Sequence, residues 1–383
     1  MALAAVNLGH DVTMVCGSYG LGNTGINQPF KNGRRSGLVD GFKVIEFDLT
    51  YSNNDNFISR TLSFLRFALR SIRIALFSQY DLIFATSTPL TAGIPGVFAR
   101  WLRGKTFIFE VRDLWPELPK AMGVISNPLI LALMSFLEWV SYRSAHRLIG
   151  LSPGICEGIV QKGVKKSRVK LVPNGCDLNI FSSKPLRNYP ITGISDNDFV
   201  AVFTGTHGPA NGLDAVLDAA KVLIESKYKK IKILLIGDGK LKSSLKKRAY
   251  DENIENVIFM DPVPKAELAS IMTRANIGMQ ILADVPAFYF GTSPNKFFDY
   301  LASGLPVLNN YPGWLAEMIN EFDCGYTINP NDPQAFANAL LDASQNSEKL
   351  ASMGKNSKKL AIEKFDRKKL SSEWVNWVTE NNT

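Results

Sequence analysis

Short β-rich runs alternate with helical patterns along the whole chain, and few folds accommodate such an order. Repeated alternation of strand and helix predicts parallel sheets with helices on both faces, and the rhythm occurs twice. The predicted strands of the first half are Asp11–Gly17, Phe42–Asp48, Asp81–Thr86, Thr106–Arg112, His146–Ser152 and Val169–Pro173. Those of the second half are Phe199–Gly205, Lys232–Gly237, Val257–Pro262, Ile277–Leu282, Pro306–Asn310 and Gly325–Asn329.

The pattern breaks at Asp177–Ser195, where Pro, Asn and Ser gather and predict a linker. A chain of 383 residues with 46% apolar residues is long enough for about two globular domains. We therefore expect a first domain over residues 1–180, a second over 181–365 and a final helix over 366–383. In such sheets ligands bind outside the carboxyl ends of the strands, so a cleft between the domains is the expected place of the chemistry.

Composition excludes several classes of protein. The four cysteines are scattered and the chain has three histidines, so neither a disulfide framework nor a zinc site is expected, and a reducing cytosol fits best. The first ten residues lack the basic start and apolar core of a signal peptide. No uncharged apolar run of about 18 residues occurs, so we expect no membrane span.

The net charge of +8 lies in the first half, where 20 Lys and Arg oppose 12 Asp and Glu. Much of it falls in Phe57–Phe77, an apolar helical pattern that carries Arg60, Arg66, Arg70 and Arg73. This pattern is typical either of a helix on an anionic membrane surface or of a crossover helix whose arginines face solvent. Nucleic acid is not an expected partner, because apolar residues interleave with the arginines and no nucleic-acid motif occurs.

The strongest candidate binding site lies in the second half. Ser293 is predicted as the N-cap of a helix and Pro294 as its first residue. The free N–H groups of Asn295, Lys296 and Phe297, with the lysine charge, then form a phosphate site. Asp299, about one and a half turns further on, is placed to accept hydrogen bonds from sugar hydroxyls. The alternative is a capped surface helix without a ligand.

Three other loops of the second half follow predicted strands, at residues 204–213, 235–239 and 261–264. Glycines in the first two let the backbone approach a phosphate closely, and the third offers apolar contact to a flat base. Each could be an ordinary turn. Together with the Ser293 helix they form four loops at one sheet edge, which favours a single nucleotide-like ligand.

These motifs, with Pro173–Asp177, resemble in order and spacing the retaining glycosyltransferase family four, of GT-B fold, over nearly the whole chain. The sequence is most similar to a bacterial subgroup described as N-acetylfucosamine (L-fucosamine) transferases, with which it shares phrases such as Phe109–Glu117 and Asn309–Leu315. The resemblance implies an α/β protein of two doubly wound Rossmann-like parallel-sheet domains facing each other across a cleft. It also implies a UDP-sugar donor in the second domain and an acceptor in the first.

The resemblance assigns donor contacts residue by residue. Asp299 matches the second acid of the family's Glu-x7-Glu motif, which binds the ribose, whereas the first acid falls on Gly291. The family's phosphate-neutralising Arg and Lys fall on Thr206 and Asn211, so we expect Lys296 and Arg112 to substitute for them. The implied donor-binding residues are Gly205, Thr206, His207, Gly208, Asn211, Gly237, Asp238, Gly239, Val263, Thr292, Ser293, Pro294, Asn295, Lys296 and Asp299.

The implied catalytic residues lie at the end of a first-half strand. The family's histidine falls on Arg112, which is followed by Asp113; an arginine can stabilise a leaving diphosphate but cannot act as a base. The resemblance implies front-face attack, in which the departing phosphate oxygen takes the acceptor's proton. Glu110 and Glu117 are the expected acceptor-binding residues. Alternatively, Arg112 and Asp113 form a local ion pair.

The resemblance further implies a polyprenyl-diphosphate-linked saccharide acceptor, assembly of O-antigen or capsule, and a peripheral position on the inner face of the plasma membrane. No cofactor or metal is expected, and Asp196–Asp198 is interpreted as a turn despite its Asp-x-Asp pattern. Members of the family begin with a strand ahead of the helix that ends near Gly9, so we expect a central strand of the first sheet to be missing. Ser371–Val378 resembles the family's crossover helix.

Other functions stay open. A nucleotide-sugar epimerase of the same fold would bind the same donor without an acceptor. A catalytically inactive nucleotide-binding module is a second alternative. A dehydrogenase is not expected, because neither half combines Gly-x-Gly-x-x-Gly with an acid about 20 residues later.

Overall fold

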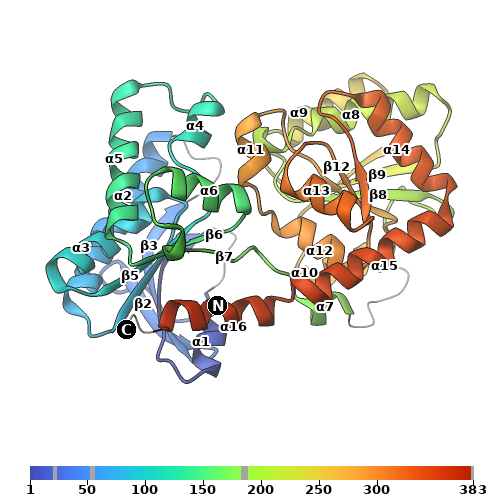
Figure 1. The fold of residues 1–383 in the computed structure, drawn as a ribbon. Helices are drawn as coiled ribbons and strands as arrows, with labels where there is room; N and C mark the ends of the chain where they lie inside the picture. Colours follow the sequence, from blue (N-terminus) through green and yellow to red (C-terminus); the bar gives the residue numbers. More distant parts are fainter. Residues whose placement is uncertain (20–23, 52–56, 183–188, 381–383) are drawn as a thin grey trace. The chain divides into compact units, whose positions relative to one another are not determined.

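The computed structural model describes residues 1–19, 24–51, 57–182 and 189–380 (Figure 1). It contains two compact units, one formed by Met1–Pro173 with Lys368–Thr383 and the other by Asn174–Arg367. Residues 183–188 of the predicted linker lie outside the described residues. None of the helices within the described ranges is long and apolar enough to cross a membrane.

The first unit contains two sheets. One has the order β1-β3-β2 and the other, all parallel, the order β4-β5-β6-β7. The strands are β1 (Thr13–Tyr19), β2 (Arg34–Val39), β3 (Phe42–Tyr51), β4 (Leu82–Thr86), β5 (Thr106–Val111), β6 (Arg147–Gly150) and β7 (Val169–Leu171). The helices are α1 (Ala2–Asn7), α2 (Phe57–Phe77), α3 (Ile94–Arg103), α4 (Glu117–Ala121), α5 (Pro128–Ser144), α6 (Pro153–Gln161) and α16 (Arg367–Thr379). The six strands predicted in this half are confirmed.

Strand β2 was not predicted; it pairs antiparallel with β3 and departs from the expected all-parallel arrangement. Val39 pairs with Phe42, so the connecting loop consists of Asp40 and Gly41, whose φ angles are 48° and 85°. Two positive φ values are typical of a type I′ hairpin, for which Asp-Gly is a strong signal. β2 itself is half-exposed and carries two arginines and a glycine, so it lacks the apolar run by which the other strands were predicted.

Helices cover both faces of the four-stranded sheet. Phe107 and Phe109 of β5 pack into a core with α5 and α6, whereas Ile108 packs with α1 and α16. This alternation follows from the two-residue period of a strand. Trp374 of α16 is buried in the second cluster and lies edge-on to the ring of Phe84, at 4.8 Å between centroids. The last helix of the chain is therefore part of the first unit's core.

The second unit has one parallel six-stranded sheet of order β10-β9-β8-β11-β12-β13. Its strands are β8 (Phe199–Thr204), β9 (Ile231–Ile236), β10 (Val257–Met260), β11 (Ile277–Gln280), β12 (Val307–Asn309) and β13 (Gly325–Thr327). All six were predicted. Its helices are α7 (Leu178–Ser182), α8 (Asp214–Glu225), α9 (Lys242–Asp251), α10 (Lys265–Met272), α11 (Pro286–Gly291), α12 (Asn295–Ser303), α13 (Trp314–Glu321), α14 (Pro333–Gln345) and α15 (Ser347–Lys364).

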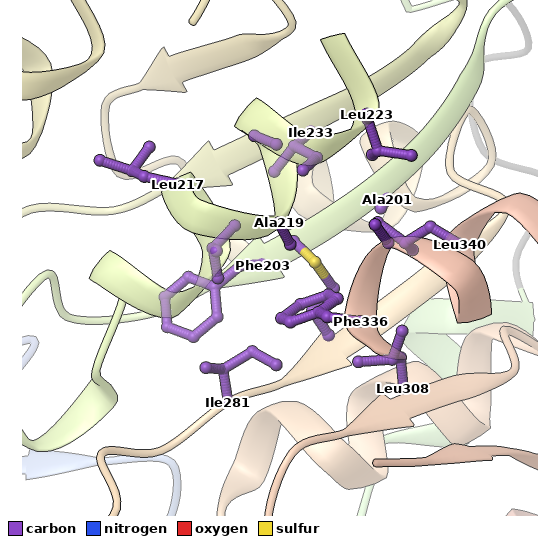
Figure 2. Packing of buried hydrophobic residues seen from close by; sticks show 14 of the residues in the cluster. Ala201, Phe203, Leu217, Ala219, Leu223, Ile233, Ile281, Leu308, Phe336 and Leu340 are labelled. Atoms are coloured by element: carbon purple, nitrogen blue, oxygen red, sulfur yellow. The ribbon is translucent and has the colours of Figure 1, made fainter. Parts of the chain in front are cut away.

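The core of the second unit lies between the sheet and helices α8 and α14. Phe203 of β8 and Phe336 of α14 belong to one cluster of buried side chains in this layer, shown in Figure 2. Strand order reverses at β8, since β9 and β10 lie on one side of it and β11 to β13 on the other. A crevice at the carboxyl ends of such strands is the usual ligand site of a doubly wound sheet.

Candidate functional site

Two glycine-containing loops meet at the carboxyl end of β8 and β9. Gly237 has a φ of 149°, and a Cβ atom there would lie 1.8 Å from the carbonyl oxygen of Gly205. The backbone N–H of His207 donates to the carbonyl of Asp238 at 2.9 Å, which ties the loops together. Only glycine fits at position 237, so this close backbone contact is built into the sequence.

Gly208 differs from Gly237. Its φ is −117°, and an added Cβ would approach only Thr206 Cγ2, at 3.4 Å. The fold therefore does not require glycine at position 208. A ligand that approaches the loop backbone closely would require it.

Lys296 of α12 places its charge in the glycine loop. Its Nζ donates to Asn211 Oδ1 at 3.0 Å and lies 3.7 Å from the centroid of the Phe203 ring. Asn211 is itself held by a 2.7 Å hydrogen bond to the carbonyl of Thr206. Burial lowers the pKa of Lys296 to about 7. No described carboxylate forms an ion pair with Lys296, so an anionic ligand would supply the negative charge that its ammonium lacks as a partner.

His207 lies beneath the loop and not on its surface. Its side chain is fully buried, with its ring 6.2 Å from those of Phe203 and Phe259. Neither ring nitrogen has a partner within the described chain. Burial, followed by repulsion from Lys242, lowers the pKa of His207 to about 4. The side chain of His207 therefore packs beneath the loop, and the donor contact of this residue stays a prediction.

The start of α12 differs from the prediction. The helix begins at Asn295, and Pro294 is the N-cap, with an extended φ of −77° and ψ of 131°. The hydroxyl of Ser293 does not cap the helix, because it accepts the backbone N–H of Asn174 at 3.1 Å. Within the described residues no acceptor is present for the N–H groups of Asn295 and Lys296. The amides of Asn295 and Lys296 are therefore free as expected. The prediction is wrong for Phe297, whose N–H donates to the carbonyl of Pro294 at 3.1 Å, and the cap is not the expected one.

Asp299 is 8% exposed and lies on the side of α12 that meets α10. Its Oδ1 is 3.2 Å from Lys265 Nζ, which also lies 2.8 Å from Asp177 Oδ2. Burial raises the pKa of Asp299, and Lys265 opposes this effect. Asp299 is thus a largely buried carboxylate that pairs with Lys265, and the charge of Arg367 also lowers its pKa.

The other predicted donor residues lie in the adjoining loops. Val263 is half-buried between β10 and α10, and the carboxylate of Asp238 accepts the N–H of Gly239 at 2.8 Å. The carbonyl of Thr292 accepts the indole N–H of Trp314 at 2.6 Å. Gly291 ends α11 and offers no acid.

The predicted catalytic residues lie in the first unit, directly after β5. Arg112 Nη1 is 3.3 Å from Glu110 Oε1, so the ion pair expected as an alternative forms with Glu110 and not with Asp113. Glu110 is 3% exposed and also accepts the hydroxyl of Thr86 at 2.7 Å. Asp113 Oδ2 instead accepts the hydroxyl of Thr88 at 3.1 Å, and burial raises the pKa of this carboxyl.

Two further residues at this position were not identified from the sequence. Ser87 Oγ accepts the backbone N–H of Arg112 at 2.9 Å. Thr88 has a φ of 111°, which is strained for a β-branched residue, and such strain gathers at functional sites. Both follow β4 directly, so their place after a predicted strand was the signal.

Glu117 lies apart from this group of contacts. It begins α4 and pairs with Lys162 at 2.6 Å, while Lys162 also lies 3.1 Å from Glu138. Asp196–Asp198 forms a turn before β8, in which the N–H of Ser195 donates to Asp198 at 2.7 Å. Within the described ranges no group of three or more His, Cys, Asp and Glu could hold a metal ion.

Comparison with known proteins agrees with this arrangement. Residues 187–360 match the family described as glycosyl transferases group 1, and residues 1–175 match the glycosyl transferase 4-like domain. The fold and these matches define the chain as a GT-B glycosyltransferase. Together, the two matches show that the chain belongs to the glycosyltransferases of the GT4 type.

The probable glycosyltransferase WbjE of Pseudomonas aeruginosa is 24% identical to this chain over 307 residues, which cover 77% of this chain and 74% of WbjE. WaaG, a glycosyltransferase involved in lipopolysaccharide biosynthesis, superposes with a TM-score of 0.69 at 15% identity, covering 99% of this chain and 94% of WaaG. HepE of Anabaena, in complex with UDP and glucose, gives a TM-score of 0.65 at 19% identity over 87% of this chain and 86% of HepE. These structures show the shared fold.

Proposed function

We propose that this protein is a retaining glycosyltransferase that moves a sugar from a UDP-linked donor to a polyprenyl-diphosphate-linked saccharide. The observation that carries the proposal is the position of Lys296, whose ammonium lies in the glycine loop beside the free amides of α12. A cation without a carboxylate partner, next to a helix N-terminus, fits a diphosphate. The complex of HepE with UDP and glucose supports a nucleotide-sugar donor.

The donor would lie along the carboxyl edge of the second sheet. Its diphosphate would contact Lys296 and the backbone of Gly205 and Gly208, and its ribose would bind Asp299. The base would lie against Val263, and Thr292 and Ser293 would be close to the transferred sugar.

The chemistry would depend on charge stabilisation and orientation. As the glycosidic bond to the diphosphate breaks, negative charge builds on the leaving group, which favours helix N-termini and guanidinium groups. Arg112 would stabilise that charge, while Asp113 and Glu110 would orient the acceptor hydroxyl. In front-face attack the leaving phosphate oxygen accepts the hydroxyl proton, so no protein base is required and no metal is proposed.

We infer further that the acceptor is a membrane lipid used in O-antigen or capsule assembly, at the inner face of the plasma membrane. WaaG, which is involved in lipopolysaccharide biosynthesis, supports the polysaccharide context, and an N-acetylated deoxyhexosamine is the proposed sugar. Exposed Leu129, Leu133, Phe136 and Trp139 follow one face of α5, as in a helix that contacts lipid. The arginines of α2 do not share one role, because Arg70 donates to the carbonyl of Gly33 at 2.9 Å.

The test is sugar transfer by the intact protein. Radiolabelled UDP-sugars are incubated with the protein and a bacterial lipid extract, and the labelled lipid is measured. The proposal predicts labelled lipid that disappears on Asp299→Ala substitution. Conversion of the UDP-sugar to another UDP-sugar without lipid would instead indicate an epimerase. Tight UDP binding with no product under any condition would indicate an inactive binding module.

A further inference from the structure

A small pocket of the first unit gathers three arginines at the amino ends of β6 and β7. Its volume is about 220 Å³, and its lining residues are Arg100, Arg143, Ser144, Ala145, His146 and Arg168. Arg112 and Asp113 lie at the carboxyl end of the neighbouring parallel strand β5, so the pocket is at the opposite edge of the sheet. It is therefore separate from the candidate catalytic residues.

Local hydrogen bonds fix the cationic lining. Arg168 donates through Nε to the carbonyl of His146 at 3.0 Å and through Nη2 to that of Ala145. His146 Nδ1 accepts the N–H of Phe107 at 3.0 Å, so a neutral ring carries its proton on Nε2 and can donate. None of the lining residues is acidic, and Arg100 and Arg143 form no ion pair with any described residue.

Helix dipoles explain only part of this arrangement. Arg100 and Arg143 lie in the last turns of α3 and α5, where cations are favourable. The carboxyl ends of two helices carry roughly half a negative charge each, which cannot neutralise three guanidinium groups. Burial and the nearby Arg143 lower the pKa of Arg168, as expected for cations held together without an anion.

Two exposed tryptophans flank the pocket. The indole N–H of Trp101 donates to Ser144 Oγ at 2.7 Å, while the Trp101 side chain stays 66% exposed. Trp139 lies one helical turn before Arg143 on α5, is 55% exposed and stacks on Phe136 at 6.0 Å between centroids. Tryptophan beside arginine is the combination favoured at the interface between water and lipid.

We propose that Arg100, Arg143 and Arg168 bind the phosphate group of an anionic lipid headgroup, with Trp101 and Trp139 in the interfacial layer beside it. Guanidinium groups bind phosphate oxygens with paired, charge-assisted hydrogen bonds, and the pocket offers three of them. Inorganic phosphate presents the same oxygens as a lipid headgroup, so the experiment must distinguish free phosphate from lipid as the ligand. The site does not depend on sugar transfer, because it involves none of the donor or catalytic residues.

The experiment compares the intact protein with Arg100→Gln/Arg143→Gln and with a control, Lys120→Gln/Lys43→Gln, which removes two exposed charges of the same unit outside the pocket. Sedimentation is measured with vesicles of phosphatidylcholine with or without phosphatidylglycerol, and inorganic phosphate is titrated separately. The pocket variant should bind anionic vesicles roughly tenfold more weakly than the wild type and the control, with an unchanged thermal midpoint.

The separate arms decide the source of the phosphate. Loss of inorganic phosphate binding in the pocket variant, with vesicle binding unchanged, would support the anion site but overturn the lipid as its ligand. Unchanged binding of both, equal weakening in the control variant, or no binding of either by the wild type would overturn the proposal.

Discussion

The ammonium nitrogen of Lys296 lies 3.0 Å from the side-chain oxygen of Asn211. Asn211 occupies the position at which the resemblance places a phosphate-binding lysine. Lys296 of α12 therefore supplies a cation at a loop position that lacks its own. Because burial lowers the pKa of Lys296 to about 7, the lysine is only partly protonated near neutral pH without a ligand, and a bound anion should raise that pKa and restore the full charge.

Two glycines of the candidate donor site should respond differently to alanine. Gly237→Ala should destabilise the protein by roughly 1–3 kcal/mol or more, because the new Cβ would meet the carbonyl of Gly205 at a positive φ. Gly208→Ala should leave the unfolding midpoint unchanged but weaken UDP binding, since its Cβ would meet only a ligand near the loop. Thermal unfolding with and without UDP measures both. If Gly208→Ala binds UDP with unchanged affinity, the loop does not contact the phosphates.

The ribose contact of Asp299 predicts discrimination between UDP and 2′-deoxy-UDP. The wild type should lose roughly 1–3 kcal/mol of binding free energy with the deoxy ligand, because a largely buried carboxylate would lose a hydrogen bond. Asp299→Ala should bind both ligands equally and more weakly. Calorimetric titration gives the four affinities. If the Asp299→Ala variant still prefers UDP to 2′-deoxy-UDP as strongly as the wild type does, another group binds the ribose hydroxyl.

Asp113→Asn should stabilise the protein while lowering transfer. Burial raises the pKa of Asp113, so its stabilising contribution is present below the ordinary carboxyl pKa and is lost as pH rises through the folded value. The amide of the variant stays uncharged, so it avoids the cost of burying an ionised carboxylate. The variant's thermal midpoint should therefore exceed that of the wild type at pH 7 to 8 and converge with it in acid. The transfer rate should fall, because an amide cannot accept the hydroxyl's hydrogen bond as a carboxylate does. A midpoint gain that does not vary with pH would contradict the electrostatic explanation.

The exposed face of α5 predicts a contribution of apolar side chains to vesicle binding. Phe136→Ser/Trp139→Ser should weaken sedimentation with anionic vesicles roughly tenfold or more, since each ring would lose its burial in lipid. Tyr250→Ser is the control, because Tyr250 is 83% exposed on the second unit. Equal binding by wild type and the α5 variant would exclude this face as a lipid contact.

Most of the fold could be predicted from local pattern, because apolar strand runs and intervening helices carry their own signals. β2 lacked such a run, and its Asp40–Gly41 turn was the signal that should have revealed it. The loops after β8 and β9 were identified correctly as neighbours, since carboxyl ends of parallel strands share one edge.

Contacts between distant parts of the sequence could not be predicted in the same way. Ser293 had the residue type of an N-cap, but Asn174, far earlier in the chain, occupies its hydroxyl. The ring of His207 packs with those of Phe203 and Phe259 beneath the loop, a position that the sequence did not indicate. Likewise the pairing of Arg112 with Glu110, and not with Asp113, depends on the strand geometry that directs each side chain.

The most direct test of the diphosphate site compares UDP with uridine in wild type and Lys296→Met, by calorimetric titration at pH 6.5. Lys296 contacts only the diphosphate in this account, and a charged hydrogen bond of this kind is worth roughly 1.5–3 kcal/mol. We predict that the variant binds UDP about tenfold or more weakly and binds uridine as the wild type does. Equal UDP affinity in the two proteins, or an equal loss for UDP and uridine, would contradict a diphosphate site at the start of α12.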